Sequence, residues 1–250
     1  MATCGGYRRA FVHVDVNSAR LWVEDEGDGP AVLFLHGGLG DSRLFEPQAK
    51  ALADRFRCVR VDLRLWGRSE APGDPFSWIE DAVGVLDALS IERAALVGLS
   101  FGGGIALDVA LAHPDRVSAL VHVAAGVSGM PVNPYTPEHE ARDDEMEVDF
   151  EVWAPLGADD FMRELWRSTP EARGVPNGAE PAPRDAAQPE QLQCPVLVIV
   201  AKHDPPAQIE VGRELARRAP NAQFVEVDSD HYLTLREADT VTQLIRDFLA

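Results

Sequence analysis

The stretch Val97-Gly-Leu-Ser-Phe-Gly-Gly-Gly104 decides the fold of this chain. It joins a continuous apolar run, Ala94–Gly98, to an apolar segment of helical period, Phe101–Ala112. A buried strand that turns sharply into a helix strains the backbone of the residue at the turn, and glycines on either side let neighbouring backbone approach. Ser100 then lies at a helix N-terminus, where free N–H groups favour developing negative charge. The stretch predicts a nucleophilic serine; the alternative is an incidental N-cap serine in a glycine-rich turn.

A nucleophilic serine needs a base, and His231 is the best-placed histidine for that role. It lies between the last predicted strand, Gln223–Val227, and the last predicted helix, Glu237–Leu249. That position is a loop at the carboxyl edge of the sheet, where the active sites of open α/β sheets gather. The alternative is a surface histidine near a helix start.

The base needs a carboxylate to orient it, and Asp204 is the predicted partner. It directly follows the apolar run Val196–Ala201 and therefore reaches the same carboxyl edge. Asp228 and Asp230 are rivals that lie close to the histidine in sequence, but closeness on a short turn does not aim a carboxylate at the ring. The predicted triad is Ser100, Asp204 and His231.

Acyl transfer also needs backbone N–H groups aimed at the developing oxyanion. Phe101, which follows the nucleophile, supplies one of them. We expect the second from the glycine-rich loop His36-Gly-Gly-Leu-Gly40, with Gly38 as the donor and Gly37 as the second choice. A merely flexible glycine turn is the alternative.

The rest of the chain alternates short β-rich runs with segments of helical period. This alternation, after an antiparallel start, predicts a mostly parallel, doubly wound sheet with helices on both faces. The predicted strands are Phe11–Val16, Ala19–Glu24, Ala31–His36, Cys58–Val61, Ala94–Gly98, Val117–Ala124, Val196–Ala201 and Gln223–Val227. The predicted helices are Leu44–Ala53, Ser77–Leu89, Phe101–Ala112, Gln208–Arg218 and Glu237–Leu249.

One long segment, residues 126–193, breaks this alternation because it contains many prolines and no buried strand. Its helix-like pieces, Glu140–Val152 and Asp159–Arg167, and its large apolar side chains predict a small helical cap. We therefore expect a core of residues 1–125 and 194–250. Within the cap, residues 169–191 contain few large apolar side chains, which indicates a partly mobile connection.

Composition excludes several classes of function. The formal net charge is -18, which repels nucleic acids and anionic membranes. Residues 138–151 carry much of the acid; their spacing suits a solvated helix face and matches no known metal site, so no metal is expected.

Three cysteines without a framework spacing fit a reducing compartment, and Cys58 and Cys194 each begin an apolar run typical of the core. The first residues contain no apolar segment of the kind found in signal peptides, and no stretch of 18 apolar residues occurs. These observations predict a cytoplasmic protein.

Together these pieces resemble the α/β-hydrolase superfamily, in the branch with a helical cap after the sixth strand. The matching stretches are His36-Gly-Gly38, Asp62-Leu-Arg64 with Gly67-Arg-Ser69, Gly98-Leu-Ser-Phe-Gly-Gly103, His113-Pro-Asp-Arg-Val117, Asp204 and His231. The resemblance implies the α/β-hydrolase fold, with an eight-stranded sheet and the cap inserted after strand 6. It also implies a cofactor-free enzyme that acts on a small molecule, as a monomer or homodimer.

One loop departs from that family pattern. Similar proteins read Asp-x-Arg-Gly-x-Gly-x-Ser, and here the first glycine is Leu65, followed by Trp66. These two side chains either pack beneath the cap or at a partner surface, or they shape an apolar pocket. Leucine resists a positive φ that glycine accepts, so the sequence alone does not decide the path of the loop. The predicted substrate pocket consists of Gly37, Leu39, Leu65, Trp66, Trp153, Phe161, Met162 and Trp166.

We therefore expect a serine hydrolase that cleaves an ester or lactone of modest size and apolar or aromatic character. Serine at position 100 argues against dehalogenases and epoxide hydrolases, which use aspartate there. The resemblance equally allows a carbon–carbon bond hydrolase acting on a diketone. A relative that only binds a ligand is the remaining alternative.

Overall fold

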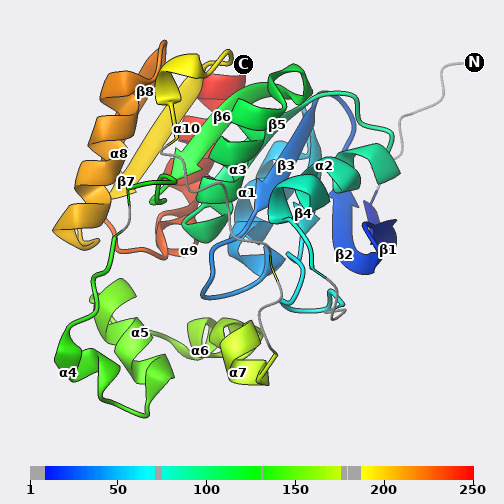
Figure 1. Ribbon diagram of the computed structural model, residues 1–250. Coiled ribbons are helices and arrows are strands. Elements are labelled where there is room, and N and C mark those ends of the chain that lie inside the picture. The colour runs from blue at the N-terminus through cyan, green and yellow to red at the C-terminus, as the bar shows by residue number, and fades with distance from the viewer. Residues whose placement is uncertain (1–8, 71–74, 131, 176–178, 180–186) are drawn as a thin grey trace, which may run out of the picture.

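A mostly parallel sheet of eight strands forms the centre of the protein (Figure 1). The computed structural model describes residues 9–70, 75–130, 132–175, 179 and 187–250. The strands are β1 Arg9–Val16, β2 Ala19–Glu26, β3 Ala31–Leu35, β4 Arg57–Val61, β5 Ala94–Leu99, β6 Val117–Val123, β7 Val196–Ala201 and β8 Ala222–Val227. Their spatial order is β1-β2-β4-β3-β5-β6-β7-β8. The predicted fold class is confirmed, and the predicted strands differ from these only at their ends.

Strand direction places the ends of the central strands at one edge of the sheet. β2 pairs antiparallel with β1 and β4, whereas the strands from β4 through β3 to β8 all pair parallel. Parallel strands share a carboxyl edge. The loops after β3, β5, β7 and β8 therefore open at the same edge.

Helices cover both faces of the sheet because successive strand residues point in opposite directions. On β3, for example, Leu33 packs into one core and Phe34 into the other. The first core takes its helical side chains from α2 Trp78–Ala88, α3 Phe101–Ala112 and α8 Pro206–Arg218. The second takes them from α1 Glu46–Leu52, α9 Leu233–Arg236 and α10 Ala238–Leu249. This is the doubly wound arrangement that the sequence predicts.

The predicted helix Leu44–Ala53 is divided in the structure. A short 3-10 turn, η1 Ser42–Phe45, precedes α1, and Pro47 stands in the first turn of α1. Proline has no N–H to donate, so it is tolerated only in the first turn of a helix. A second 3-10 turn, η2 Pro114–Arg116, leads into β6.

Short helices fill the segment between β6 and β7 and gather beneath one edge of the sheet (Figure 1). They are α4 Pro137–Glu140, α5 Glu145–Trp153, α6 Asp160–Trp166 and α7 Pro170–Arg173, followed by the 3-10 turn η3 Pro189–Gln191. The predicted piece Glu140–Val152 is thus two helices, of which α4 is capped by the Thr136 hydroxyl. Much of the connection expected to be mobile, including 176–178 and 180–186, lies outside the described residues.

Leu65 takes the backbone conformation that glycine would favour. Its φ is 84°, while its side chain is buried in the first core at 2% exposure. Two hydrogen bonds tie this loop to the segment between β6 and β7, called the insertion below: Arg173 Nη1 donates to the Leu65 carbonyl at 2.7 Å, and the Gly67 N–H donates to the Ser168 carbonyl at 3.0 Å.

Substitutions at Leu65 should reverse the usual order of alanine and glycine. Leu65→Ala loses buried side-chain volume and keeps the positive φ, so we expect it to cost about 3 kcal/mol of unfolding free energy. Leu65→Gly loses one more carbon but relieves a left-handed strain of about 1–2 kcal/mol, so it should be at least as stable as Leu65→Ala. Urea unfolding of both variants tests this.

Leu63 provides the matched control, because it is buried in the same loop and is not among the residues with positive φ. There the glycine variant should be less stable than the alanine variant by about 0.5–1 kcal/mol. The same order at position 65 as at position 63 would contradict the strain argument.

His122 is a second buried feature with an energetic consequence. Its Nε2 lies 3.1 Å from the Gly126 carbonyl, to which it donates, and its Nδ1 has no hydrogen-bond partner among the described residues. Burial lowers the pKa of His122 to about 4. Because the neutral ring is the folded form, protonation favours the unfolded chain, and stability falls as the pH drops from 6.5 towards 4.

Acidification should therefore weaken the wild type more than His122→Phe. Between pH 7 and pH 5 we expect His122 to contribute a loss of about 2 kcal/mol, which a phenylalanine at the same place does not show. The measurement is the free energy of unfolding in guanidinium chloride at both pH values. An equal loss in both proteins would show that this ring does not carry the effect.

Candidate active site

The turn between β5 and α3 holds Ser100 at φ 52° and ψ -118°. Its N–H donates to the Val123 carbonyl at 2.8 Å, which fixes the turn to β6. A Cβ at Gly98 would lie 2.4 Å from the Gly102 carbonyl oxygen, and one at Gly102 would lie 2.1 Å from the Leu35 carbonyl oxygen. Only glycine fits at these positions, so the close approach expected from the sequence is present.

Asp204 and His231 meet at the carboxyl edge of the sheet. Nδ1 of His231 lies 3.1 Å from each carboxylate oxygen of Asp204, and both side chains are buried. Since a carboxylate accepts, Nδ1 carries the proton and donates it, which leaves Nε2 as the acceptor. The hydrogen bonds formed by the described residues do not include one between this nitrogen and the Ser100 hydroxyl.

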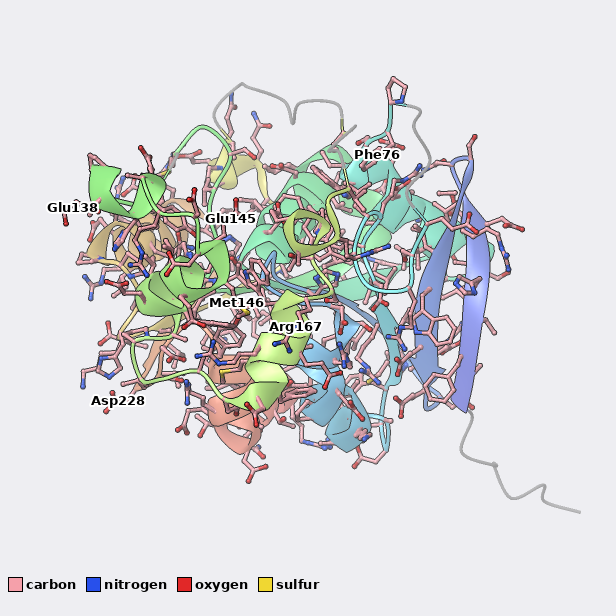
Figure 2. The ribbon with its side chains drawn as sticks, turned by 90° about the horizontal axis from the view of Figure 1, so that it is seen from below. Phe76, Glu138, Glu145, Met146, Arg167 and Asp228 are labelled. Atoms are coloured by element: carbon pink, nitrogen blue, oxygen red, sulfur yellow. The ribbon has the colours of Figure 1, made fainter. Side chains whose placement is uncertain are left out.

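The rival carboxylates have other partners. Asp228 is exposed and accepts from His203 Nε2 at 2.9 Å, and Figure 2 shows it at the rim of the molecule. Asp230 is fully buried, but its carboxylate accepts from Arg236 Nε at 2.8 Å and from the Leu156 N–H at 3.3 Å. Of the three candidates, the structure brings only Asp204 to the ring of His231.

The glycine loop after β3 lies against the turn that carries Ser100. A Cβ at Gly37 would lie 3.3 Å from the Cβ of Ser100, and one at Gly38 would lie 3.8 Å from the Cβ of Phe101. No described group accepts a hydrogen bond from the N–H of Gly38 or of Phe101. The loop that carries one predicted donor therefore lies against the residue that supplies the other.

His36 fixes the direction of the Gly38 N–H. Its Nε2 accepts from the Leu63 N–H at 2.9 Å, so its Nδ1 carries the proton and donates to the Gly37 carbonyl at 2.8 Å. Burial lowers the pKa of His36, which keeps the ring neutral. In a trans peptide the N–H points opposite to the carbonyl, so a fixed Gly37 carbonyl also fixes the Gly38 N–H.

Trp66 supports the same loop from the other side. Its Nε1 donates to the Gly38 carbonyl at 2.8 Å, and its ring stacks on Phe101 at 5.4 Å between centroids. Trp78 packs edge-on against both rings. Trp66 and Leu65 are buried in the first core, and neither lines the cavity that reaches Ser100.

The insertion touches the histidine through Trp153. The two rings lie 4.5 Å apart, and the His231 N–H donates to the Trp153 carbonyl at 3.2 Å. Trp153 Nε1 donates to the hydroxyl of Tyr135 at 2.7 Å, and that hydroxyl donates to Asp149 at 2.6 Å. Trp166 Nε1 donates to the same carboxylate at 2.7 Å, so Trp153 and Trp166 are fixed by one network.

The remaining residues of the predicted pocket lie elsewhere. Phe161 is 39% exposed beneath the guanidinium of Arg43, and Met162 is buried in the second core. Leu39 packs against that core, and its carbonyl lies 3.5 Å from the Tyr232 hydroxyl.

A cavity of about 700 Å³ reaches Ser100 and Phe101. None of the other residues predicted for the site or its pocket lines it. Its walls come from the start of α2, one face of α3, residues 126–130 and Val132, and they include Trp78, Ile79, Ile105, Asp108 and Met130. The sequence analysis did not predict this wall. The spacing of Ser100, Gly104 and Asp108 could have indicated it, because residues four apart lie on one face of a helix.

Within the described ranges, no group of three or more His, Cys, Asp or Glu side chains is arranged to hold a metal ion. In the same part of the chain, no helix is both long and apolar enough to cross a lipid bilayer.

Comparison with known proteins supports the reading of the fold. The profile of the α/β-hydrolase fold family matches residues 30–153, and a profile described as TAP-like protein matches residues 161–250. A 2-hydroxymuconate semialdehyde hydrolase from Pseudomonas putida is 28% identical, over 92% of this chain and 91% of its own.

Two solved structures are similar over nearly the whole chain. The enol-lactonase from Burkholderia xenovorans LB400 is 27% identical, with a TM-score of 0.73, over 98% of this chain and 99% of its own. A thermophilic esterase from Thermogutta terrifontis is 25% identical, with a TM-score of 0.76, over 97% and 98% respectively. With this strand order and these matches, the chain belongs to the α/β-hydrolase superfamily.

Proposed function

We propose that this protein is a serine hydrolase that cleaves a carboxylic ester or lactone through an acyl-enzyme. The observation that carries the proposal is the buried pair in which Nδ1 of His231 faces both oxygens of Asp204, at the edge where Ser100 is held in its strained turn. Such a pair leaves Nε2 of the histidine available as a base. The relatives are hydrolases, which fits this class of reaction.

In the first half of the reaction, the Ser100 hydroxyl attacks the carbonyl carbon and gives its proton to Nε2 of His231. Asp204 keeps the ring in the correct tautomer and stabilises the imidazolium. The negative oxygen of the tetrahedral intermediate accepts from the N–H groups of Gly38 and Phe101. The carbon–oxygen bond then breaks, and the leaving alkoxide takes the proton from His231.

In the second half, His231 removes a proton from water, and the hydroxide attacks the acyl-enzyme. Collapse of the second tetrahedral intermediate breaks the bond to Ser100, whose oxygen recovers the proton from His231. For a lactone, both product groups remain in one molecule. The chemistry needs no group beyond water and the side chains and N–H groups named here.

We assign the enzyme to the cytoplasm, with a small apolar or aromatic substrate.

Carbon–carbon bond hydrolysis is the second candidate. The observation in its favour is the similarity over most of both chains to the 2-hydroxymuconate semialdehyde hydrolase. The same triad serves both reactions, so turnover of matched ester, lactone and vinylogous diketone substrates distinguishes them. A ligand-binding relative without activity turns over none of the three.

Loss of the nucleophile, or of the carboxylate that orients His231, should nearly abolish turnover. We expect Ser100→Ala to lower kcat by about 10⁴–10⁶ and Asp204→Asn by about 10³–10⁴, with the fold intact. The measurements are hydrolysis of p-nitrophenyl acetate and labelling by a fluorophosphonate, which should mark the wild type and not Ser100→Ala. Asp228→Asn, a change of the exposed rival acid, is the matched control and should keep full activity. If the wild type showed no labelling and no turnover, the proposal would be overturned.

Trp66 should affect rate more than binding. Trp66→Phe keeps an aromatic ring against Phe101 but removes the hydrogen bond to the Gly38 carbonyl. Since complete loss of an oxyanion donor costs about 10²–10³ in kcat, loosening one should cost about tenfold, with KM nearly unchanged. Trp22→Phe on β2 is the control, because the Trp22 ring lies against the guanidinium of Arg68 and its Nε1 donates to Glu24 rather than to the Gly38 carbonyl. A change confined to KM would show that Trp66 acts on substrate binding instead.

A further inference from the structure

The cavity at Ser100 follows α3 away from the nucleophile. Phe101, Gly104, Ile105, Asp108 and Ala112 all line it. Their spacing of three and four residues places them on one face of the helix. At a rise of 1.5 Å per residue, Asp108 lies about 12 Å along the axis from Ser100. The cavity is therefore an elongated trough with the nucleophile at one end.

The middle of the trough is apolar. Trp78 and Ile79 from α2, Ile105 from α3, and Met130 and Val132 from the segment after β6 form its walls. Such walls suit a hydrocarbon chain, since burial of apolar surface contributes about 25 cal/mol per Å².

The far end of the trough is acidic. Asp108 lines it together with Ser128, whose hydroxyl donates to the Asp108 carboxylate at 2.8 Å. Glu80 also lines it and lies 3.1 Å from His113, at the end of α3. Among the described residues that line the cavity there is no lysine or arginine to attract a carboxylate.

Asp108 has no cationic partner among the residues that the structure describes. Within the described part of the chain it forms no ion pair, and its hydrogen bond comes from the neutral hydroxyl of Ser128. Burial raises the pKa of Asp108, which reflects the cost of a carboxylate in these surroundings. Partly buried charges are generally paired. A ligand cation beside Asp108 would offset that cost, and the formal net charge of -18 attracts cations to the protein.

We propose that this trough binds the acyl chain of the substrate, with the scissile carbonyl at Ser100 and a terminal ammonium group at Asp108. The proposal rests on the serine hydrolase function proposed above and names its substrate class: esters or lactones with an apolar chain of roughly eight carbons that ends in a primary amine. Acyl chains that end in a carboxylate are rejected by Asp108 and Glu80.

A matched series of p-nitrophenyl esters tests the proposal. Its members are the octanoate, the 8-aminooctanoate and the mono-ester of octanedioic acid, which end in methyl, ammonium and carboxylate. For the wild type we expect kcat/KM to be about 100-fold higher for the ammonium ester than for the carboxylate ester, since attraction and repulsion contribute about tenfold each. In Asp108→Asn the ratio should fall below about tenfold. Asp115→Asn, an exposed acid outside the trough, removes the same charge and should leave the ratio at its wild-type value.

A binding measurement separates this proposal from the proposed function. Isothermal titration calorimetry should show that octylamine binds the wild type more tightly than octanoate does, and that Asp108→Asn reduces this difference, with Glu80 accounting for what remains. Hydrolysis of the esters without a charge preference, or with a preference that is as large in Asp108→Asn as in the wild type, overturns the trough assignment and leaves the hydrolase intact. No hydrolysis of any ester, with octylamine still bound through Asp108, overturns the hydrolase and supports the trough. If no ester is hydrolysed and octylamine does not bind through Asp108, the hydrolase and the trough assignment are both overturned.

Discussion

The close contact between the end of β5 and the start of α3 is the constraint on which the site depends. The carbonyl oxygens of Leu35 and Gly102 occupy the space that side chains at Gly102 and Gly98 would need. This contact brings β3, β5 and α3 together at one point and holds Ser100 in a conformation that an isolated chain avoids. The surrounding sheet, buried on both faces, supplies the packing that maintains the strain.

Buried polar groups then fix each loop relative to that point. His36 joins the loops after β3 and β4 by hydrogen bonds, and Trp66, which belongs to the first core, donates to the carbonyl of Gly38. Asp204 and His231 join the loops after β7 and β8. Each bond uses a buried donor and acceptor that would cost free energy if left unpaired, so the loops have few alternative arrangements.

Sequence reasoning was strongest where function depends on local pattern. The placement of Ser100, Asp204 and Gly38 at one edge of the sheet could be predicted because each lies within three residues of the end of a buried apolar run, and the ends of parallel strands share an edge. The path of the Leu65 loop could not be predicted, because burial of the side chain and strain of the backbone oppose each other and only packing decides. The trough could not be predicted, because α2, α3 and the described residues that follow β6 each contribute only part of its wall.

The bonds of the insertion to the core bear on how such enzymes diversify. Arg173 and Ser168 bind the backbone around Leu65, and Trp153 binds the backbone and the ring of His231. The insertion therefore is not an exchangeable module. A chimera that took this segment from a relative would alter the surroundings of the histidine along with the substrate site. Recombination at the ends of the insertion is thus constrained, and new specificity is more accessible through point substitutions in the trough along α3.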